Sequence, residues 1–252
     1  MRLLYFDSSR RLTSADFSRK PIPPYAILSH TWGDDEFLFE DLVNGTGESK
    51  AGYKKIRFCG EQTARDSLQY FWLDTCCIDK WKISELSHAI NSMFRWYKNA
   101  AKCYAFLSDV STSPTDAQRH QSTWEASFRK SRWFTRGWTL QELLAPALID
   151  FFSLEGQRIG DKASLEQQIC EITRIPATAL RGDALDEFSI PERMAWMAGR
   201  QTKEEEDMAY SLIGIFDVSM EFRYGEGKER ALNRLQEEMG KGTASILCSH
   251  KY

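Results

Sequence analysis

The sequence predicts an α/β fold with a doubly wound, mainly parallel sheet and a C-terminal helical extension. Segments of strand character alternate with longer helical ones, which is typical of a parallel sheet covered by helices on both faces. The run "YFWLDTCCID" (Tyr70–Asp79) is almost continuously apolar, as expected of a strand buried on both faces. After about Gly160 the strand signal fades. We therefore expect an α/β core over residues 1–160 and a helical extension over residues 161–252 that packs on it.

The first half of the core begins with a strand at Tyr25–His30, which follows two prolines and ends in the turn-rich stretch "TWGDD". A weakly patterned helix is predicted at Gly52–Ser67, and Tyr70–Asp79 is the second strand. Ser84 is the expected N-cap of the next helix, with Glu85 in its first turn. Apolar residues at helical spacing predict the rest of this helix: Leu86, Ile90, Met93, Tyr97 and Ala101.

The second half of the core continues with a third strand at Lys102–Val110 and a polar loop at Ser111–Gln121. Arg132–Ala145 is predicted to be helical, entered through a turn at Gly137 and ended by Pro146. Ala147–Ser153 is the fourth strand. Three helices are expected in the extension, within 189–200, 203–217 and 227–239.

Charge and composition argue against several functional classes. The 33 basic and 36 acidic residues are evenly mixed and give a net charge of -3, so no basic patch indicates nucleic-acid binding. No apolar run approaches the roughly 18–20 residues that span a bilayer. The first residues carry an acid and arginines where a signal peptide is apolar. We expect a cytoplasmic protein without a membrane span.

The cysteines and histidines give no metal motif. Six cysteines are scattered without a CxxC pair, and the four histidines lack metal-ligand spacing. We expect reduced cysteines that serve as small core residues, and neither a metal nor a tightly bound cofactor.

Ligands of open parallel sheets bind beyond the carboxyl ends of the strands, and this rule selects candidate binding residues. The first strand ends in Ser29, His30, Thr31, Trp32, Gly33 and Asp34; the second ends near Asp74 and Asp79, and the third at Ser108 and Asp109. His30 is a candidate general base, although a histidine at a strand end more often hydrogen-bonds the backbone.

Glu142 is the one carboxylate in the apolar stretch "RGWTLQELLAP" (Arg136–Pro146). Trp138 and Glu142 are four residues apart and would share a helix face. A carboxylate beside an indole in a partly desolvated cleft would have a raised pKa. The alternative is a surface ion pair of Glu142 with Arg136 or Arg132, and spacing alone favours this alternative.

A glycine-containing stretch, "YGEGKER" (Tyr224–Arg230), lacks the spacing of a phosphate loop and does not follow a strand. It is interpreted as a turn that opens the last helix.

Three blocks of the sequence resemble the fungal heterokaryon-incompatibility (HET) domain in order and spacing. They are "YAILSHTWGDDE", "FWLDTCCID" followed by "AINSMFRWYKNA", and "SRWFTRGWTLQELLAP". Arg193–Met239 is similar to the segment that follows those blocks in fungal members, so the resemblance covers Arg2–Met239. It implies a role in non-self recognition and innate immunity of filamentous fungi, where the domain triggers programmed cell death. It also implies NLR-type receptor domains as partners, since many members carry a nucleotide-binding module.

The family also looks distantly similar to Toll/interleukin-1 receptor (TIR) domains, which implies a TIR- or flavodoxin-like sheet. In TIR domains that cleave NAD+, the catalytic glutamate lies in a pattern close to S-x-W-C-x-x-E-L. "RGWTLQEL" is similar, with Trp138 at the tryptophan, Glu142 at the glutamate and Thr139 in place of the cysteine. The resemblance implies self-association on activation.

If the resemblance extends to chemistry, the chain is an NAD+ glycohydrolase. Glu142 would stabilise the oxocarbenium-like ribose as nicotinamide leaves, and Trp32 or Trp138 could stack on a ring. The amides of Trp32, Gly33 and Asp34, with Arg132 or Arg136, could meet the pyrophosphate, and Ser29, His30 and Asp74 complete the expected binding set. The rival hypothesis is a non-enzymatic scaffold that self-associates and recruits partners. A nucleotide-binding domain without turnover is a third.

Overall fold

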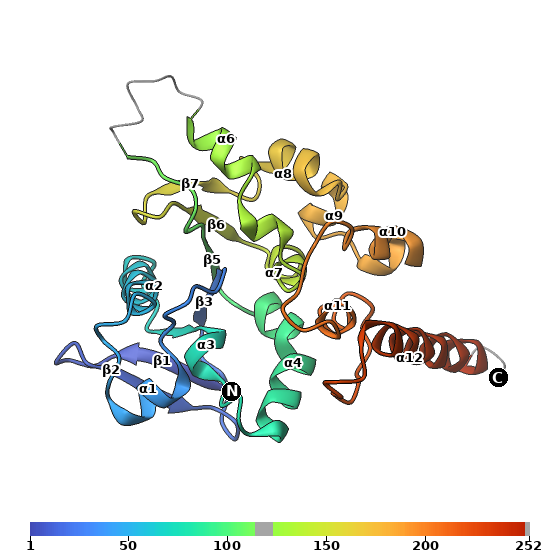
Figure 1. The fold of residues 1–252 in the computed structure, drawn as a ribbon, viewed down its shortest axis with the longest axis horizontal. Coiled ribbons are helices and arrows are strands. Elements are labelled where there is room, and N and C mark those ends of the chain that lie inside the picture. Colours follow the sequence, from blue (N-terminus) through green and yellow to red (C-terminus); the bar gives the residue numbers. More distant parts are fainter. Residues whose placement is uncertain (114–122, 250–252) are drawn as a thin grey trace.

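One mixed sheet organises the N-terminal two thirds of the chain (Figure 1). The computed structural model describes residues 1–113 and 123–249, without the side chains of Thr123 and residues 242–249. Within this part, seven strands are ordered β2-β1-β4-β3-β5-β6-β7. Their bounds are β1 Arg2–Phe6, β2 Leu12–Asp16, β3 Tyr25–His30, β4 Tyr70–Trp72, β5 Lys102–Phe106, β6 Ile149–Phe152 and β7 Arg158–Asp161.

The four central strands are parallel, and the strands outside them are antiparallel. β3 pairs in parallel with β4 and with β5, and β5 pairs in parallel with β6. β1, β2 and β7 add antiparallel pairs at the two margins. All six residues of β3 are buried, as expected of a central strand covered on both faces. The expected α/β class is confirmed, with a mixed sheet whose centre is parallel.

Helices cover both faces of this sheet (Figure 1). α2 lies on one side, and α4 and α7 lie on the other. The helical segments before β6 are α1 Phe39–Asn44, α2 Tyr53–Arg65, α3 Asp74–Cys77, α4 Ile83–Lys98, α6 Thr123–Arg129, the 3-10 turn η1 Arg132–Thr135 and α7 Thr139–Leu144. The strand order reverses between β3 and β5, because the chain moves from β3 outward to β4 and then returns across β3 to β5.

All the regular elements that the structure describes after β7 are helical. They are α8 Glu166–Thr173, α9 Ala177–Arg181, the 3-10 turn η2 Leu185–Glu187, α10 Ile190–Ala195, α11 Asp207–Tyr210 and α12 Lys228–Ser249. α12 projects away from the sheet (Figure 1). Ser189 caps α10 through a capping box with Glu192. The division at residue 160 stays a prediction; β7, which the sequence did not indicate, ends at Asp161.

The prediction of one long second strand is wrong beyond Trp72. β4 pairs with β3 over Tyr70–Trp72, and the chain then turns into the one-turn helix α3. A short apolar run does not distinguish a strand from a buried helical turn. Asp74 in the first turn of α3 favours the helix, because a carboxylate is stabilised at a helix N-terminus.

Several predicted helix bounds also differ. α4 begins at Ile83 with Lys82 at its N-cap, so Ser84 lies inside the helix, and Ala101 lies beyond its end. The predicted helix Arg132–Ala145 is divided into η1 and α7. Only Asp207–Tyr210 of the predicted helix 203–217 is α-helical. The predicted loop Ser111–Gln121 lies, from residue 114 on, outside the described residues.

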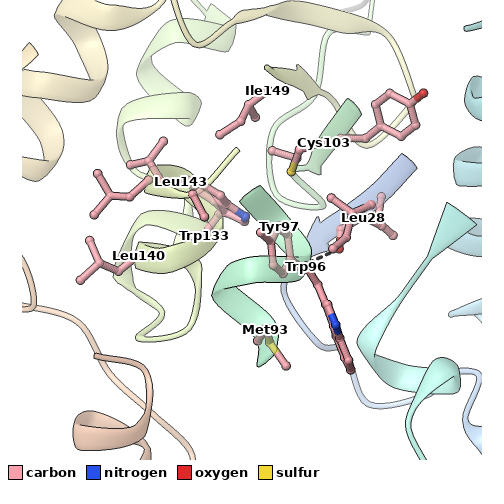
Figure 2. Close-up of a cluster of buried hydrophobic side chains, with 14 of the residues drawn as sticks. Leu28, Met93, Trp96, Tyr97, Cys103, Trp133, Leu140, Leu143 and Ile149 are labelled. Carbon is pink, nitrogen blue, oxygen red and sulfur yellow. Dashed lines mark hydrogen bonds between the residues drawn. The ribbon is translucent and has the colours of Figure 1, made fainter. Parts of the chain in front are cut away.

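The core on the α4–α7 side brings the sheet and α7 together. Figure 2 shows Leu140 and Leu143 of α7 in one cluster with Trp133, Tyr97 and Leu28, and all five side chains are almost completely buried. The Tyr97 hydroxyl donates to the Leu28 carbonyl oxygen at 3.0 Å. This packing fixes α4 and α7 against β3, the strand that carries the first candidate binding residues.

Candidate functional site at the carboxyl edge of the sheet

Glu142 lies buried against the end of β3. Its side chain accepts a hydrogen bond from the Ser29 hydroxyl, with Oγ and Oε2 2.5 Å apart. The Trp133 indole nitrogen donates to the same Ser29 oxygen at 2.7 Å. Glu142 is only 7% exposed. The interpretation of Glu142 as a surface ion-pair partner of Arg132 or Arg136 is therefore wrong.

Burial raises the pKa of Glu142 to about 8, from an ordinary value of 4.5. The hydrogen bond from Ser29, the nearby Tyr97 hydroxyl and the positive charge of Arg200 oppose this increase, whereas the negative charge of Asp74 adds to it. The carboxyl group therefore titrates near neutral pH, where a small change in its surroundings changes its charge.

The turn into α7 depends on Gly137. A Cβ at this position would lie 2.5 Å from Cγ2 of Thr202 and 2.8 Å from Cε of Met197. The Gly137 amide donates to the Gln201 carbonyl at 2.9 Å. A segment far along the chain therefore packs directly on the turn that aims Glu142 at Ser29.

His30 is a link in an ion network. Nε2 lies 3.2 Å from Oδ1 of Asp74, and Nδ1 lies 3.2 Å from Nζ of Lys55. Nδ1 also lies 3.3 Å from the Thr31 carbonyl oxygen. Lys55 also donates to the Thr31 carbonyl at 3.0 Å and pairs with Glu36. Both ring nitrogens are engaged, so His30 has none left to act as a general base in this arrangement.

Asp74 and Trp32 extend this network to the surface. The Trp32 indole nitrogen donates to Oδ2 of Asp74 at 2.8 Å, and Nζ of Lys80 lies 3.5 Å from the centre of the Trp32 ring. Burial would raise the pKa of Asp74, but Lys80 and the hydrogen bonds from His30 and Trp32 lower it well below its usual range. Asp74 is therefore the ionised carboxylate at this edge, and Trp32, 39% exposed, is the exposed aromatic ring beside it.

The amide of Gly33, one of the three expected to meet a pyrophosphate, is already engaged. The Gly33 amide donates to Oε1 of Glu36 at 2.7 Å. Asp34 is exposed. The carboxylate of Glu36 thus occupies the donor that was expected to meet a pyrophosphate.

Arg132, Arg136 and Trp138 do not converge on Glu142. Arg132 is exposed, and its Nε lies 3.9 Å from the carboxylate of Asp109. The carbonyl of Arg136 accepts from Nη1 of Arg200 at 2.8 Å. The Trp138 indole donates to Asp207 at 2.9 Å, whereas Glu142 faces Ser29. Trp138 and Glu142 lie one helical turn apart, since the Glu142 amide donates to the Trp138 carbonyl at 3.4 Å, but their side chains contact different partners.

Sequence reasoning missed three residues that surround Glu142. Trp133 fixes Ser29, the polar hydroxyl of Tyr97 lies near Glu142, and Arg200 contributes a positive charge to it. Arg200 also donates to the Thr139 hydroxyl at 3.0 Å. No local pattern in the sequence indicates Arg200, since it lies 58 positions after Glu142.

A cavity of about 1020 Å³ lies elsewhere, beside Tyr25 and Ala101. These residues stand at the starts of β3 and β5, so this cavity is at the opposite end of the strands from Glu142. In the part of the chain that the structure describes, no group of three or more His, Cys, Asp or Glu side chains could hold a metal ion. Nor does any helix there have the length and apolarity to cross a bilayer.

Comparison with known proteins identifies relatives of the chain. A family model described as heterokaryon incompatibility protein (HET) matches residues 25–125. The vegetative incompatibility protein HET-E-1 of Podospora anserina is 57% identical over 244 residues, which cover 96% of this chain and 18% of that protein. The chain thus spans less than a fifth of the length of this relative. No solved structure matches the chain.

Proposed function

The chain belongs to the heterokaryon incompatibility (HET) family, and we propose that it is a cell-death effector domain of fungal vegetative incompatibility that cleaves NAD+. The bond broken is the one between nicotinamide and ribose, and Glu142 is the catalytic carboxylate. The similarity to a vegetative incompatibility protein supports the biological role. The geometry around Glu142 supports the chemistry.

The position of Glu142 at the reversal of strand order carries this proposal. The four parallel strands are ordered β4-β3-β5-β6, which is the order 2-1-3-4 when they are numbered along the chain. This order is the one of flavodoxin-like sheets, whose ligands bind where it reverses. The reversal lies between β3 and β5, and Ser29 of β3 holds Glu142 there. The order also supports the TIR-like resemblance.

The proposed reaction uses Glu142 in its ionised form. As the neutral nicotinamide leaves, positive charge develops on the ribose, and a nearby carboxylate stabilises it until water adds to the anomeric carbon and loses a proton. The cationic nicotinamide ring of NAD+ favours ionisation and so offsets the effect of burial on the pKa. Ser29 would keep the carboxylate oriented, because its hydroxyl donates to Oε2 and is itself fixed by Trp133.

Entry of NAD+ requires the elements around Glu142 to separate, because the side chain is 7% exposed. We propose that self-association on activation provides this opening, with NLR-type receptor domains as upstream partners. NAD+ is then a substrate and no cofactor stays bound. Trp32 is the exposed ring on which a base can stack.

Nicotinamide release by purified, artificially clustered protein tests the proposal. Glu142→Gln should abolish release while urea denaturation shows an intact fold. The matched control is Glu61→Gln, which removes a charge from an exposed position of α2 and should release nicotinamide at the wild-type rate. Release by Glu142→Gln at the wild-type rate, or none from folded, clustered wild type, would refute NAD+ cleavage.

A non-enzymatic scaffold is the second candidate, favoured by two exposed apolar side chains at the start of α4. Trp81 is 84% exposed and Ile83 79% exposed, which is unusual for large apolar residues in a monomer. A scaffold should keep its toxicity in Glu142→Gln and lose it in a Trp81→Ser, Ile83→Ser double variant. The proposed enzyme should instead lose its toxicity in Glu142→Gln, because that variant lacks the catalytic carboxylate.

A further inference from the structure

Arg200 is a buried cation that packs on the entrance to α7. It is 6% exposed, and its Nη1 donates to the Arg136 carbonyl at 2.8 Å and to the Thr139 hydroxyl at 3.0 Å. Its Nε donates to the Trp196 carbonyl at 3.2 Å. Thr139 and Glu142 are three residues apart in α7 and so lie on one face of the helix. Arg200 is therefore held on the side of α7 that carries Glu142.

Backbone contacts also anchor the entrance to α7. The Gln201 amide donates to the Thr135 carbonyl at 2.6 Å, and the Gly137 amide donates to the Gln201 carbonyl at 2.9 Å. Gln201 also forms an isolated parallel bridge with Arg136. Since these contacts need no charge, anchoring alone does not explain a guanidinium at position 200.

The charge of Arg200 is not neutralised by a contact. None of the carboxylates that the structure describes lies within ion-pair distance of it, and Nη2 is buried without a partner among the described residues. A buried guanidinium without a contacting anion is costly. Burial lowers the pKa of Arg200 to about 10, and the negative charge of Glu142 opposes this decrease. Arg200 in turn favours the ionised form of Glu142, so the two buried groups act on each other through a poorly polarisable interior.

The other charged and titratable groups around Glu142 do not supply this counter-charge. Asp74 is negative, and burial raises the pKa values of Tyr97 and Cys103, which keeps both groups neutral. His30 of β3 contacts Asp74. The cations of η1 and α9 are exposed and lie beside other carboxylates, Arg132 beside Asp109 and Arg181 beside Glu166.

We propose that Arg200 is a positioning residue for Glu142, with its guanidinium as the counter-charge that allows the buried carboxyl group to ionise. The consequence for catalysis rests on the proposed NAD+ cleavage, which uses ionised Glu142. The coupling between the two charges needs no turnover and is measurable in the resting protein.

Lys162 provides a matched control at the other end of α7. It is a second buried cation, 8% exposed, and its Nζ donates to the Pro146 carbonyl at 2.6 Å. Neither Lys162 nor Glu142 is a main cause of the pKa shift of the other. Lys162→Gln therefore removes a buried cation beside α7 and leaves the proposed counter-charge of Glu142 in place.

Urea denaturation between about pH 5 and pH 9.5 tests the coupling without reference to activity. The difference in stability between each protein and its Glu142→Gln counterpart levels off above the folded-state pKa of Glu142, which gives this pKa. Arg200→Gln should raise it by about one unit or more, because a nearby positive charge is lost. Arg200→Lys and Lys162→Gln should each raise it by less than about half a unit. No rise in Arg200→Gln, or an equal rise in either of the other two variants, overturns the proposal.

If Arg200→Gln is unfolded at neutral pH, the double variant with Glu142→Gln decides. Recovery of the fold supports the proposal, because the uncompensated carboxylate is then the cause of unfolding. Failure to recover shows that Arg200 serves only the fold and overturns it.

The pH profile of nicotinamide release extends the test to the reaction. Because kcat/KM reports the free enzyme, its acidic limb should move to higher pH in Arg200→Gln and stay in place in Lys162→Gln. A reduced rate without this movement overturns the proposal. If the wild type releases no nicotinamide, NAD+ cleavage is refuted, and the urea measurement still decides whether Arg200 and Glu142 are coupled.

Discussion

Replacing Glu142 by glutamine should stabilise the fold at neutral pH and leave its stability unchanged in acid. Because the folded-state pKa of about 8 lies above the ordinary value of 4.5, the folded protein binds the extra proton and loses stability as the pH rises between these values. At pH 7 the difference from the ordinary value is about 2.5 pH units, at about 1.4 kcal/mol each. Ionisable Glu142 should thus cost roughly 3–4 kcal/mol at pH 7 relative to glutamine.

Urea denaturation of wild type, Glu142→Gln and the control Glu61→Gln at pH 4.5 and pH 8 measures this difference. Glutamine is nearly isosteric and its amide oxygen can still accept from Ser29, so packing stays constant. The gain of Glu142→Gln should be large at pH 8 and fall below about 0.5 kcal/mol near pH 4.5, where the carboxyl group is protonated in the folded state and half protonated in the unfolded state. A gain that is equal at the two pH values would refute the assignment to ionisation, and a loss at both would show that Glu142 serves only the fold.

The remaining predictions concern packing. Trp133→Phe should cost about 2–4 kcal/mol in urea denaturation, because it removes the donor to Ser29 and leaves a void in a fully buried position; a loss under about 1 kcal/mol would contradict this. Gly60→Ala should cost about 1–3 kcal/mol, since its Cβ would overlap the Phe6 ring. By contrast, Gly240→Ala in α12, with nothing within 4 Å of the added Cβ, should raise the thermal midpoint by the equivalent of up to about 1 kcal/mol. If Gly240→Ala were less stable than Gly60→Ala, the packing described for these two glycines would be contradicted.

The sequence predicts the central strands well because their signal is local. β3, β5 and β6 begin at or within two residues of the predicted starts, and α2 lies inside its predicted range. A central strand is buried on both faces, so its apolar run appears directly in the sequence. β1, β2 and β7 were missed because they lie at the margins, where half-exposed residues such as Thr13 and Arg158 interrupt the apolar pattern.

The site was predicted only in part, because its geometry depends on distant contacts. The choice of Glu142 and Ser29 follows from the strand-end rule and the resemblance, and the structure brings the two together. Trp133, which contacts Ser29, lies 104 positions from it along the chain. Arg200 lies 58 positions from Glu142. Propensity and spacing report on neighbours within a few residues, so they could not indicate these contacts.

The short helix that carries Glu142 has one further consequence. All six residues of α7, from Thr139 to Leu144, are buried. No antibody, protease or recruited protein can therefore touch this helix while the fold is closed. A binding event at the surface can reach α7 only by moving the elements that enclose it. These elements include α4, α9 and the segment Arg200–Gln201, which contacts Arg136. The accessibility and charge of Glu142 are thus controlled by the elements that enclose α7. We expect natural sequence changes that alter the activity of Glu142 to lie in these enclosing elements.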